Sequence, residues 1–205
     1  SIMQCAPTFG SAALALIYLC LSAFGCVAQP SGQRSGDPTP NDRCVSILPS
    51  DARSAIETAY PGYRLPHLSD SVKEDIDWDI SIGGTGCLLV TSGKFDSDQS
   101  IDYATVVRSK NKDEDVIIIA ARNASNRWMV ERLDSWIEGE RRLFVRRLEP
   151  GSYGRETGGT DQGEGGAEGG TYTASVDGVE LGVLESVSWG CFFDGSKWIK
   201  VLLAD

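Results

Sequence analysis

The stretch YATVVRSKNKDEDVIIIAARNASNRWMVERL, residues Tyr103 to Leu133, decides the fold class. It holds three runs rich in β-branched and aromatic residues, divided by the polar segments SKNKDE and NASN. Runs of this composition favour β-strands, and connections this short favour antiparallel neighbours. The stretch therefore predicts the centre of an antiparallel meander.

Similar runs lie on both sides of this stretch. We expect further strands at Gly86–Ser92, Arg142–Leu148, Val179–Leu184, Val187–Phe193 and Lys197–Leu203. Asp194-Gly195, between the last two runs, is typical of a hairpin turn. The meander is therefore expected to continue to the end of the chain.

One helix is expected before the strands. Leu48–Gly62 (LPSDARSAIETAYPG) carries apolar residues at helical spacing, with a proline suited to the first turn and a Pro-Gly stop. The sequence thus predicts an α+β fold, in which an N-terminal helix packs on a twisted antiparallel β-sheet with meander topology.

The N-terminal part is typical of an export signal and a linker. Ser11–Gly25 is an apolar run too short to span a bilayer comfortably, and small residues follow it. Two kinds of processing stay open: lipidation of Cys26 as in a lipoprotein, or cleavage after Ala28. We expect a signal at residues 1–28, a linker at 29–43 and a single α+β domain at 44–205, with the glycine-rich residues 154–170 as a disordered loop.

The charge restricts the class of partner. The chain has a formal net charge of -10, and no charged residue precedes Arg34. This balance argues against nucleic acid, because phosphate binding needs clustered Lys and Arg. We expect an exported protein, either periplasmic or an outer-membrane lipoprotein, or else secreted. Its partner would be a protein or an envelope component, and it would touch a membrane only through a lipid anchor.

Three cysteines, Cys44, Cys87 and Cys191, follow the expected signal. Because exported domains form disulfides, one pair is expected. We predict a disulfide between Cys87 and Cys191, since both lie in strand segments flanked by glycine.

A short acidic loop precedes the central stretch, in FDSDQSIDYATVV at residues 95–107. Its polar side chains stand at every second position: Asp96, Asp98, Ser100 and Asp102. Alternate oxygen ligands in a tight loop suit Ca²⁺. A complete EF-hand is excluded, because Ile101 and Val107 stand where a glycine and a glutamate are needed. The alternative is a metal-free turn built by Asp and Ser.

The motif GKFDSDQSIDYA, residues 93–104, resembles the D-x-D-x-x-x-D loop of FG-GAP or VCBS repeats, in which a calcium loop joins two strands. With YPGYR at 60–64 and DGVELGVLESVSWGCFFDGSKWIKV at 177–201, the chain resembles a group of uncharacterised bacterial exported proteins that carry one such loop. The resemblance implies Ca²⁺ bound by Asp96, Asp98 and Asp102. Ser97, Gln99 and Ser100 replace the glycine-rich filler of that loop, so the turn differs from the family pattern.

Two catalytic arrangements compete with structural interpretations. His67 is a candidate base, with Asp70 or Asp75 as its orienting acid and Ser92 or Cys87 as nucleophile, but no nucleophile elbow accompanies them. The acids of KEDIDWDIS, residues 73–81, could pair as in glycoside hydrolases. Their alternation with Ile and Trp instead favours an edge strand with its acids facing water.

Three functions follow from these observations. The first is a non-catalytic exported binding or structural module with a calcium-clamped loop. The second is an inhibitor or immunity-like partner of a cell-envelope enzyme, presenting carboxylates to a basic site. The third is a hydrolase that uses His67.

Overall fold

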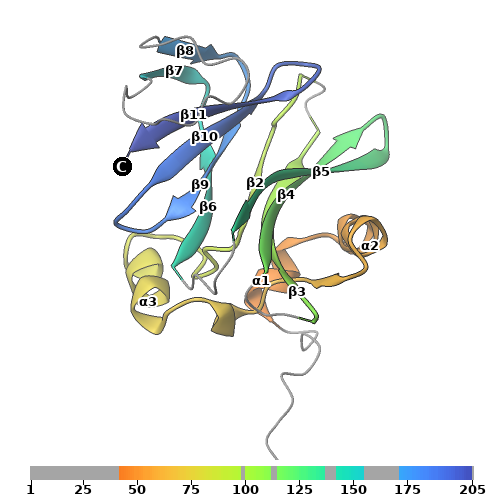
Figure 1. Cartoon of the computed structure of the whole chain (residues 1–205), viewed down its shortest axis with the longest axis vertical. Coiled ribbons are helices and arrows are strands. Elements are labelled where there is room, and N and C mark those ends of the chain that lie inside the picture. The colour runs from red at the N-terminus through yellow and green to blue at the C-terminus, as the bar shows by residue number, and fades with distance from the viewer. Residues whose placement is uncertain (1–41, 98–99, 112–114, 137–141, 155–170, 205) are drawn as a thin grey trace, which may run out of the picture. The chain divides into compact units, whose positions relative to one another are not determined.

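The computed structural model describes residues 42–97, 100–111, 115–136, 142–154 and 171–204 (Figure 1). These residues belong to one compact unit, Asp37–Asp205. The expected signal at 1–28, Cys26 and the linker up to residue 41 lie outside the described residues. No helix in the described part of the chain combines the length and apolarity needed to span a bilayer.

The helices precede most of the strands. They are α1 (Arg43–Ile47), α2 (Ser50–Ala59), the 3-10 helix η1 (Leu68–Asp70) and α3 (Lys73–Ser81). The prediction of a helix within Leu48–Gly62 is confirmed by α2, which has Pro49 at its N-cap and buries Ala52 and Ile56. Tyr60 ends the helix by donating its backbone N–H to the carbonyl of Ile56.

The first sheet has the order β1-β3-β4-β5, with β2 also paired to β3. Its strands are β1 (Tyr63–Arg64), β2 (Val90–Gly93), β3 (Asp102–Ser109), β4 (Val116–Ala124) and β5 (Arg127–Trp136). Each pairing in it is antiparallel. Ser125 and Asn126 connect β4 to β5 with φ angles of 53° and 63°, as in the two-residue turns that match strand twist.

The second sheet has the order β11-β10-β9-β6 and is also antiparallel. Its strands are β6 (Leu143–Leu148), β9 (Gly178–Val183), β10 (Ser188–Phe193) and β11 (Trp198–Ala204). A small hairpin of β7 (Gly151–Gly154) and β8 (Thr171–Ala174) forms a third sheet. Most of the glycine-rich segment predicted at 154–170 lies outside the described residues, although Gly154 belongs to β7.

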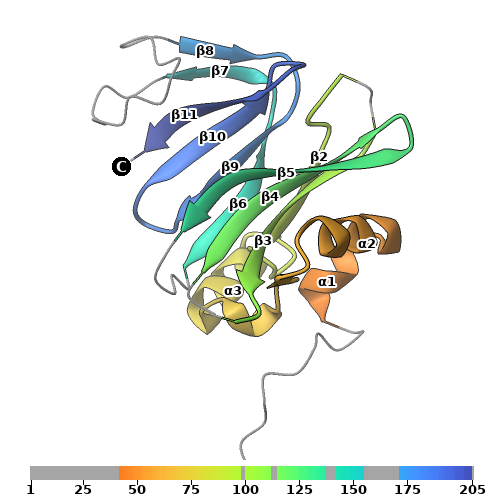
Figure 2. The same cartoon turned by 45° about the vertical axis from the view of Figure 1, so that its right-hand side comes forward.

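The two larger sheets pack against each other and enclose one core. Trp136 of β5 lies 5.8 Å from Trp189 of β10, and Phe95 lies 6.2 Å from Trp198 of β11, measured between ring centroids. Buried residues of both sheets, such as Ile118 and Leu181, belong to the same cluster. In Figures 1 and 2 the first sheet and the second sheet lie side by side, and α2 lies next to β4 and β5.

The predicted α+β fold is therefore wrong. The structure is mostly β-sheet, with several antiparallel sheets and three short α-helices in its described part. The physical reason lies in β4, whose residues Val116–Arg122 are all buried. A strand buried on both faces needs cover on both faces. The second sheet supplies one cover, and α2, with ten residues, covers only part of the other.

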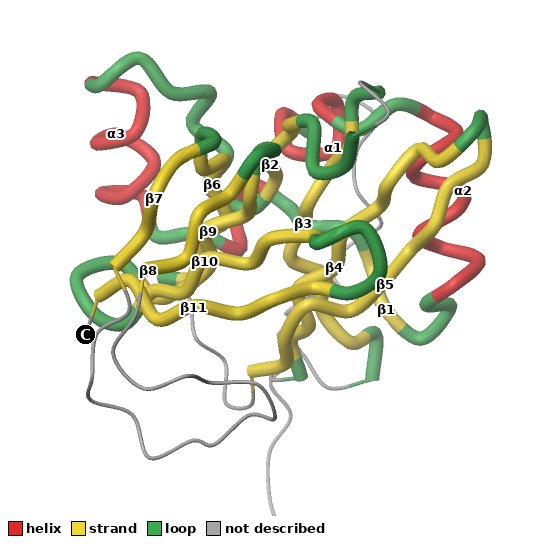
Figure 3. The backbone as a smooth tube through the Cα atoms, turned by 90° about the horizontal axis from the view of Figure 1, so that it is seen from above, coloured by secondary structure: helices red, strands yellow, loops and turns green. Residues whose placement is uncertain are grey.

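The edge strand predicted at residues 73–81 is also wrong, because these residues form α3. Asp75 and Asp79 stand four residues apart and so share one face of the helix. Both acids turn toward the rest of the fold: Asp75 binds Arg142, and Asp79 accepts the backbone N–H of Gly86 at 2.7 Å. Figure 3 places α3 and α2 on opposite sides of the sheets.

Candidate functional site

Asp102 fixes the acidic loop to the sheet. It is the first residue of β3 and is fully buried. Its Oδ2 accepts the backbone N–H of Phe95 at 2.9 Å, and its Oδ1 accepts that of Asn123 at 2.8 Å. Because its carboxylate accepts these two backbone N–H groups, Asp102 closes the loop between Phe95 and β3 and also links this loop to β4.

Asp96 lies beside the guanidinium of Arg122, which comes from the end of β4. Arg122 Nη1 is 3.3 Å from Asp96 Oδ2. The same guanidinium donates to Glu131 through Nε and Nη2, at 3.1 and 2.7 Å, and lies 3.5 Å from the ring centroid of Phe193. Because Arg122 is buried, these contacts act in a region of reduced dielectric. Arg122 therefore supplies a positive charge next to the acidic loop.

The predicted calcium ligands are only partly described. Asp98 lies outside the described residues, and Ser100 is half-buried. In the described part of the chain, no three acidic, His or Cys side chains gather as a metal-binding group. Asp102 already accepts two backbone donors and Asp96 already contacts a cation, so the described residues fit a loop balanced by arginine better than a calcium loop. The metal assignment stays a prediction.

A cleft of about 270 Å³ lies beside this loop. Its walls come from the start of the loop, from β8 and from the turn between β10 and β11. The lining side chains that matter here are Asp96, Tyr172, Thr173, Ser175, Phe193 and Asp194. The cleft thus combines two carboxylates, aromatic rings and hydroxyls, and none of the described residues that line it is basic, although Arg122 contacts both Asp96 and Phe193.

Asp194 keeps its negative charge at this cleft. Its Oδ1 accepts the backbone N–H groups of Lys197 and Ser196 at 2.9 and 2.8 Å. These two hydrogen bonds, with a third from the Ser196 hydroxyl, lower the pKa of Asp194. The bonds also build the hairpin turn predicted at Asp194-Gly195, which is confirmed by the pairing of Phe193 with Trp198.

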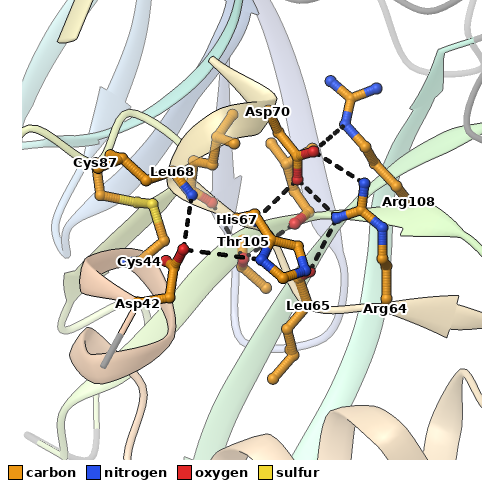
Figure 4. A network of polar contacts seen from close by, with 12 residues as sticks. Asp42, Cys44, Arg64, Leu65, His67, Leu68, Asp70, Cys87, Thr105 and Arg108 are labelled. Carbon is orange, nitrogen blue, oxygen red and sulfur yellow. Dashed lines mark hydrogen bonds and ion pairs between the residues drawn. A yellow bond between two sulfur atoms is a disulfide. The ribbon is translucent and has the colours of Figure 1, made fainter. Parts of the chain in front are cut away.

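A second polar cluster surrounds His67 and is drawn in Figure 4. Asp70 receives two hydrogen bonds from Arg64, at 2.8 and 2.9 Å, and one from the backbone N–H of His67 at 2.8 Å. Asp42 accepts the backbone N–H of Leu68 at 3.1 Å and lies 3.8 Å from His67 Nδ1. These contacts join the start of α1, β1 and η1, so the cluster holds this end of the fold together.

The charge of Asp70 is set by its neighbours. Burial alone would raise the pKa of this carboxyl group, but hydrogen bonds from Arg64 and from the His67 backbone, with the charge of Arg108, lower it overall. Arg108 Nε lies 3.8 Å from Asp70 Oδ1. Asp70 is therefore an ionised structural anchor at neutral pH.

The other groups considered for a hydrolase serve elsewhere in the fold. Asp75 receives two hydrogen bonds from Arg142, at 3.1 and 2.9 Å. Cys87 is bonded to Cys44 and carries no thiol. The acid that lies near the imidazole of His67 is Asp42, which the sequence did not indicate.

The predicted disulfide between Cys87 and Cys191 is wrong. The structure joins Cys44 to Cys87, with Cα atoms 5.2 Å apart, and leaves Cys191 as a buried thiol. Cys44 lies in α1, which packs near β2, whereas Cys191 faces the core from β10. Burial raises the pKa of the Cys191 thiol to about 12. The glycine-flanked strand pattern did not reveal this arrangement, because Cys87 precedes β2 without belonging to it.

Sequence reasoning missed Arg122 and the cleft. The signal for Arg122 is its position: it follows the apolar run Val116–Ala121 in one continuous strand. A charged residue at the end of a buried strand requires a partner, and the nearby acidic loop offers one. The cleft carries no such signal, since its residues lie far apart in the sequence.

Comparison with family models, with curated proteins and with solved structures finds no match to this chain.

Proposed function

We propose that this chain is a non-catalytic exported binding module, and that the cleft beside Asp96 takes a small organic cation. The observation that carries the proposal is the lining of that cleft: the residues of it that the structure describes include Asp194, Asp96 and aromatic rings, and none of these residues is basic. Carboxylates attract ammonium groups, and aromatic faces add a cation–π contribution. Tyr172 supplies the aromatic face, and its ring stacks on the buried ring of Phe192 with ring centroids 4.8 Å apart.

The fold already holds one cation with carboxylates and an aromatic ring. Arg122 is an internal cation, and it is held by Asp96, by Glu131 and by the ring of Phe193. Because Arg122 already pairs with Asp96 and covers the ring of Phe193, an ammonium ligand would rely mainly on Asp194 and the ring of Tyr172. The chain's overall charge of -10 further favours a cation over an anion.

Two observations support the remaining parts of the proposal. The acids proposed as orienting groups for His67 are bound to arginines, and the cysteine proposed as a nucleophile is in a disulfide, which supports a non-catalytic role. The Cys44–Cys87 disulfide supports export, because such bonds persist in oxidising compartments.

The test uses three ligands of one shape. Benzylammonium, benzyl alcohol and benzoate share a ring and differ in charge, and amide chemical shifts of residues 172–175 and 193–195 report on the cleft. We expect benzylammonium to bind with a dissociation constant on the order of millimolar, as suits so small a ligand, and benzoate to cause no shift.

The Asp194→Asn variant tests the site itself. Asparagine keeps the Oδ1 acceptor of the turn and removes the charge, so we expect binding to weaken several-fold while the hairpin stays folded. Asp77→Asn, an exposed acid on α3, is the matched control and should leave the affinity unchanged. Equal shifts with all three ligands, or equal weakening in both variants, would overturn the proposal.

A further inference from the structure

The outer face of α3 exposes large apolar side chains. Trp78 is 48% exposed and Ile82, which follows the helix, is 62% exposed. They stand four residues apart, as do Glu74 and Trp78, so the three residues lie in one line along the helix. This line, Glu74–Trp78–Ile82, is called the α3 stripe below.

The inner face of α3 is fixed by polar contacts, which prevents the helix from turning to bury the stripe. Asp75 is buried and held by Arg142, which comes from the segment before β6. Asp79 accepts the backbone N–H of Gly86. The disulfide of Cys87 to Cys44 then ties the segment after α3 to α1. The exposure of Trp78 is thus a property of the fold.

Two exposed acids of α3 lie next to the apolar residues of the stripe. Glu74 and Asp77 are exposed, and Lys73 forms an ion pair with Asp77. The other two acids of α3, Asp75 and Asp79, face the fold and do not contribute to this rim. An exposed tryptophan inside a charged rim is typical of a protein contact site, where one aromatic anchor supplies much of the binding energy.

The negative charge next to the α3 stripe favours one class of binding partner over the others. A second copy of this chain would place acids against acids, and an anionic lipid surface would repel the rim. A basic protein surface satisfies both the acids and the apolar anchors. We propose that the α3 stripe docks a protein whose contact surface is basic and contains an apolar recess for Trp78.

The stripe is separate from the cleft. Figures 1 and 2 show α3 and the β7–β8 hairpin, which borders the cleft through Tyr172 and Thr173, at opposite ends of the described unit. The docking proposal therefore does not rest on the proposed function, and each fails or stands by its own experiment.

The test uses a defined probe. A fluorescein-labelled helical peptide of Lys and Leu, with its leucines on one face, imitates a basic surface with an apolar strip, and a Lys/Ser peptide of equal charge lacks the strip. We expect the Lys/Leu peptide to bind the whole chain more tightly than the Lys/Ser peptide, with an affinity that falls as salt rises. Fluorescence anisotropy measures both.

Variants locate the binding. Trp78→Ser with Ile82→Ser should weaken the Lys/Leu peptide about tenfold or more, as expected for loss of an anchor residue. The matched control, Ile101→Ser with Met129→Ser, removes two other exposed apolar residues and should change the affinity less than twofold. Circular dichroism and melting confirm that both variants are folded.

Three outcomes would overturn the proposal. Equal binding by the two double variants would show that the stripe is not the binding site. Equal binding of the two peptides would show that the protein recognises only their charge. Binding to phosphatidylcholine vesicles, or dimerisation in sedimentation experiments, that is lost in the stripe variant would assign the surface to lipid or to a second copy instead.

Discussion

The carboxylate of Asp102 and the backbone N–H of Asn123 form a hydrogen bond of 2.8 Å between β3 and β4. The other carboxylate oxygen serves Phe95, so each oxygen of this buried side chain has a backbone donor. Asp102→Asn turns one acceptor into a donor and leaves a buried N–H without its partner. We expect it to lower the free energy of unfolding by roughly 2 to 3 kcal/mol, measured by urea denaturation.

Asp77→Asn is the control for this measurement, since Asp77 is exposed and should change stability by less than about 0.5 kcal/mol. If Asp102→Asn is as stable as the control, Asp102 does not anchor the loop.

Calcium dependence separates the two explanations of the acidic loop. Because Arg122 contacts Asp96 and backbone donors occupy both oxygens of Asp102, we expect millimolar CaCl₂ to leave the melting temperature unchanged relative to EGTA. A rise with calcium that Asp98→Asn abolishes would instead establish the calcium loop. Scanning calorimetry at constant ionic strength makes the comparison.

The pH dependence of stability follows from Asp70. Its pKa is lower in the folded state than in the unfolded chain, so its stabilising effect is fully present above the unfolded value of about 3.9. The effect is lost as pH falls through the lower folded value. We expect Asp70→Asn to be clearly less stable than wild type at pH 7, with a difference that shrinks below about pH 4.

Asp194 provides the comparison for Asp70. Its pKa is also lowered, but its side chain lies at an exposed turn. Asp194→Asn should therefore change stability much less at pH 7. A constant difference between wild type and Asp70→Asn from pH 2 to 7 would refute the anchoring role of the ionised carboxylate.

The cysteine pairing makes two measurable claims. Non-reducing peptide mapping should recover Cys44 linked to Cys87, and Cys191 should resist thiol reagents until the chain unfolds, because its thiol is buried and has a raised pKa. Removing the bond with Cys44→Ser and Cys87→Ser should destabilise the chain by about 4 kcal/mol on the loop-entropy model for a separation of 43 residues. Recovery of a Cys87–Cys191 peptide would contradict the structure.

The strands of the first sheet could be predicted from the sequence because their apolar runs are long and bounded by strong turn residues. Tyr103–Arg108, for example, falls within β3, and the NASN segment contains the β4–β5 turn. These signals are local. The strands β7 and β8 were not predicted, since they have four residues each and partly exposed side chains.

The errors concern choices that depend on distant partners. Alternating acids and apolar residues in KEDIDWDIS fit both a strand and a short helix, and the partner that decides, Arg142, lies 67 residues from Asp75. The number of sheets also depends on distant residues, because β4 is buried on both faces and other elements must pack against each face. For the site, Asp96 and Asp102 could be found from their spacing. The position of Arg122 after a buried apolar run indicates that it needs a partner, but its pairing with Asp96 depends on the fold.

The position of β5 at the end of its sheet has a consequence for solubility. In the described structure β4 is its hydrogen-bonded neighbour, and β5 is ten residues long, so a row of backbone groups faces outward. An exposed edge strand of this kind can pair with strands of other chains, which leads to aggregation. Arg127 and Arg132 are exposed on this strand, and an approaching strand would have to remove water from their charged groups. The exposed arginines of β5 thus oppose the addition of strands from other chains.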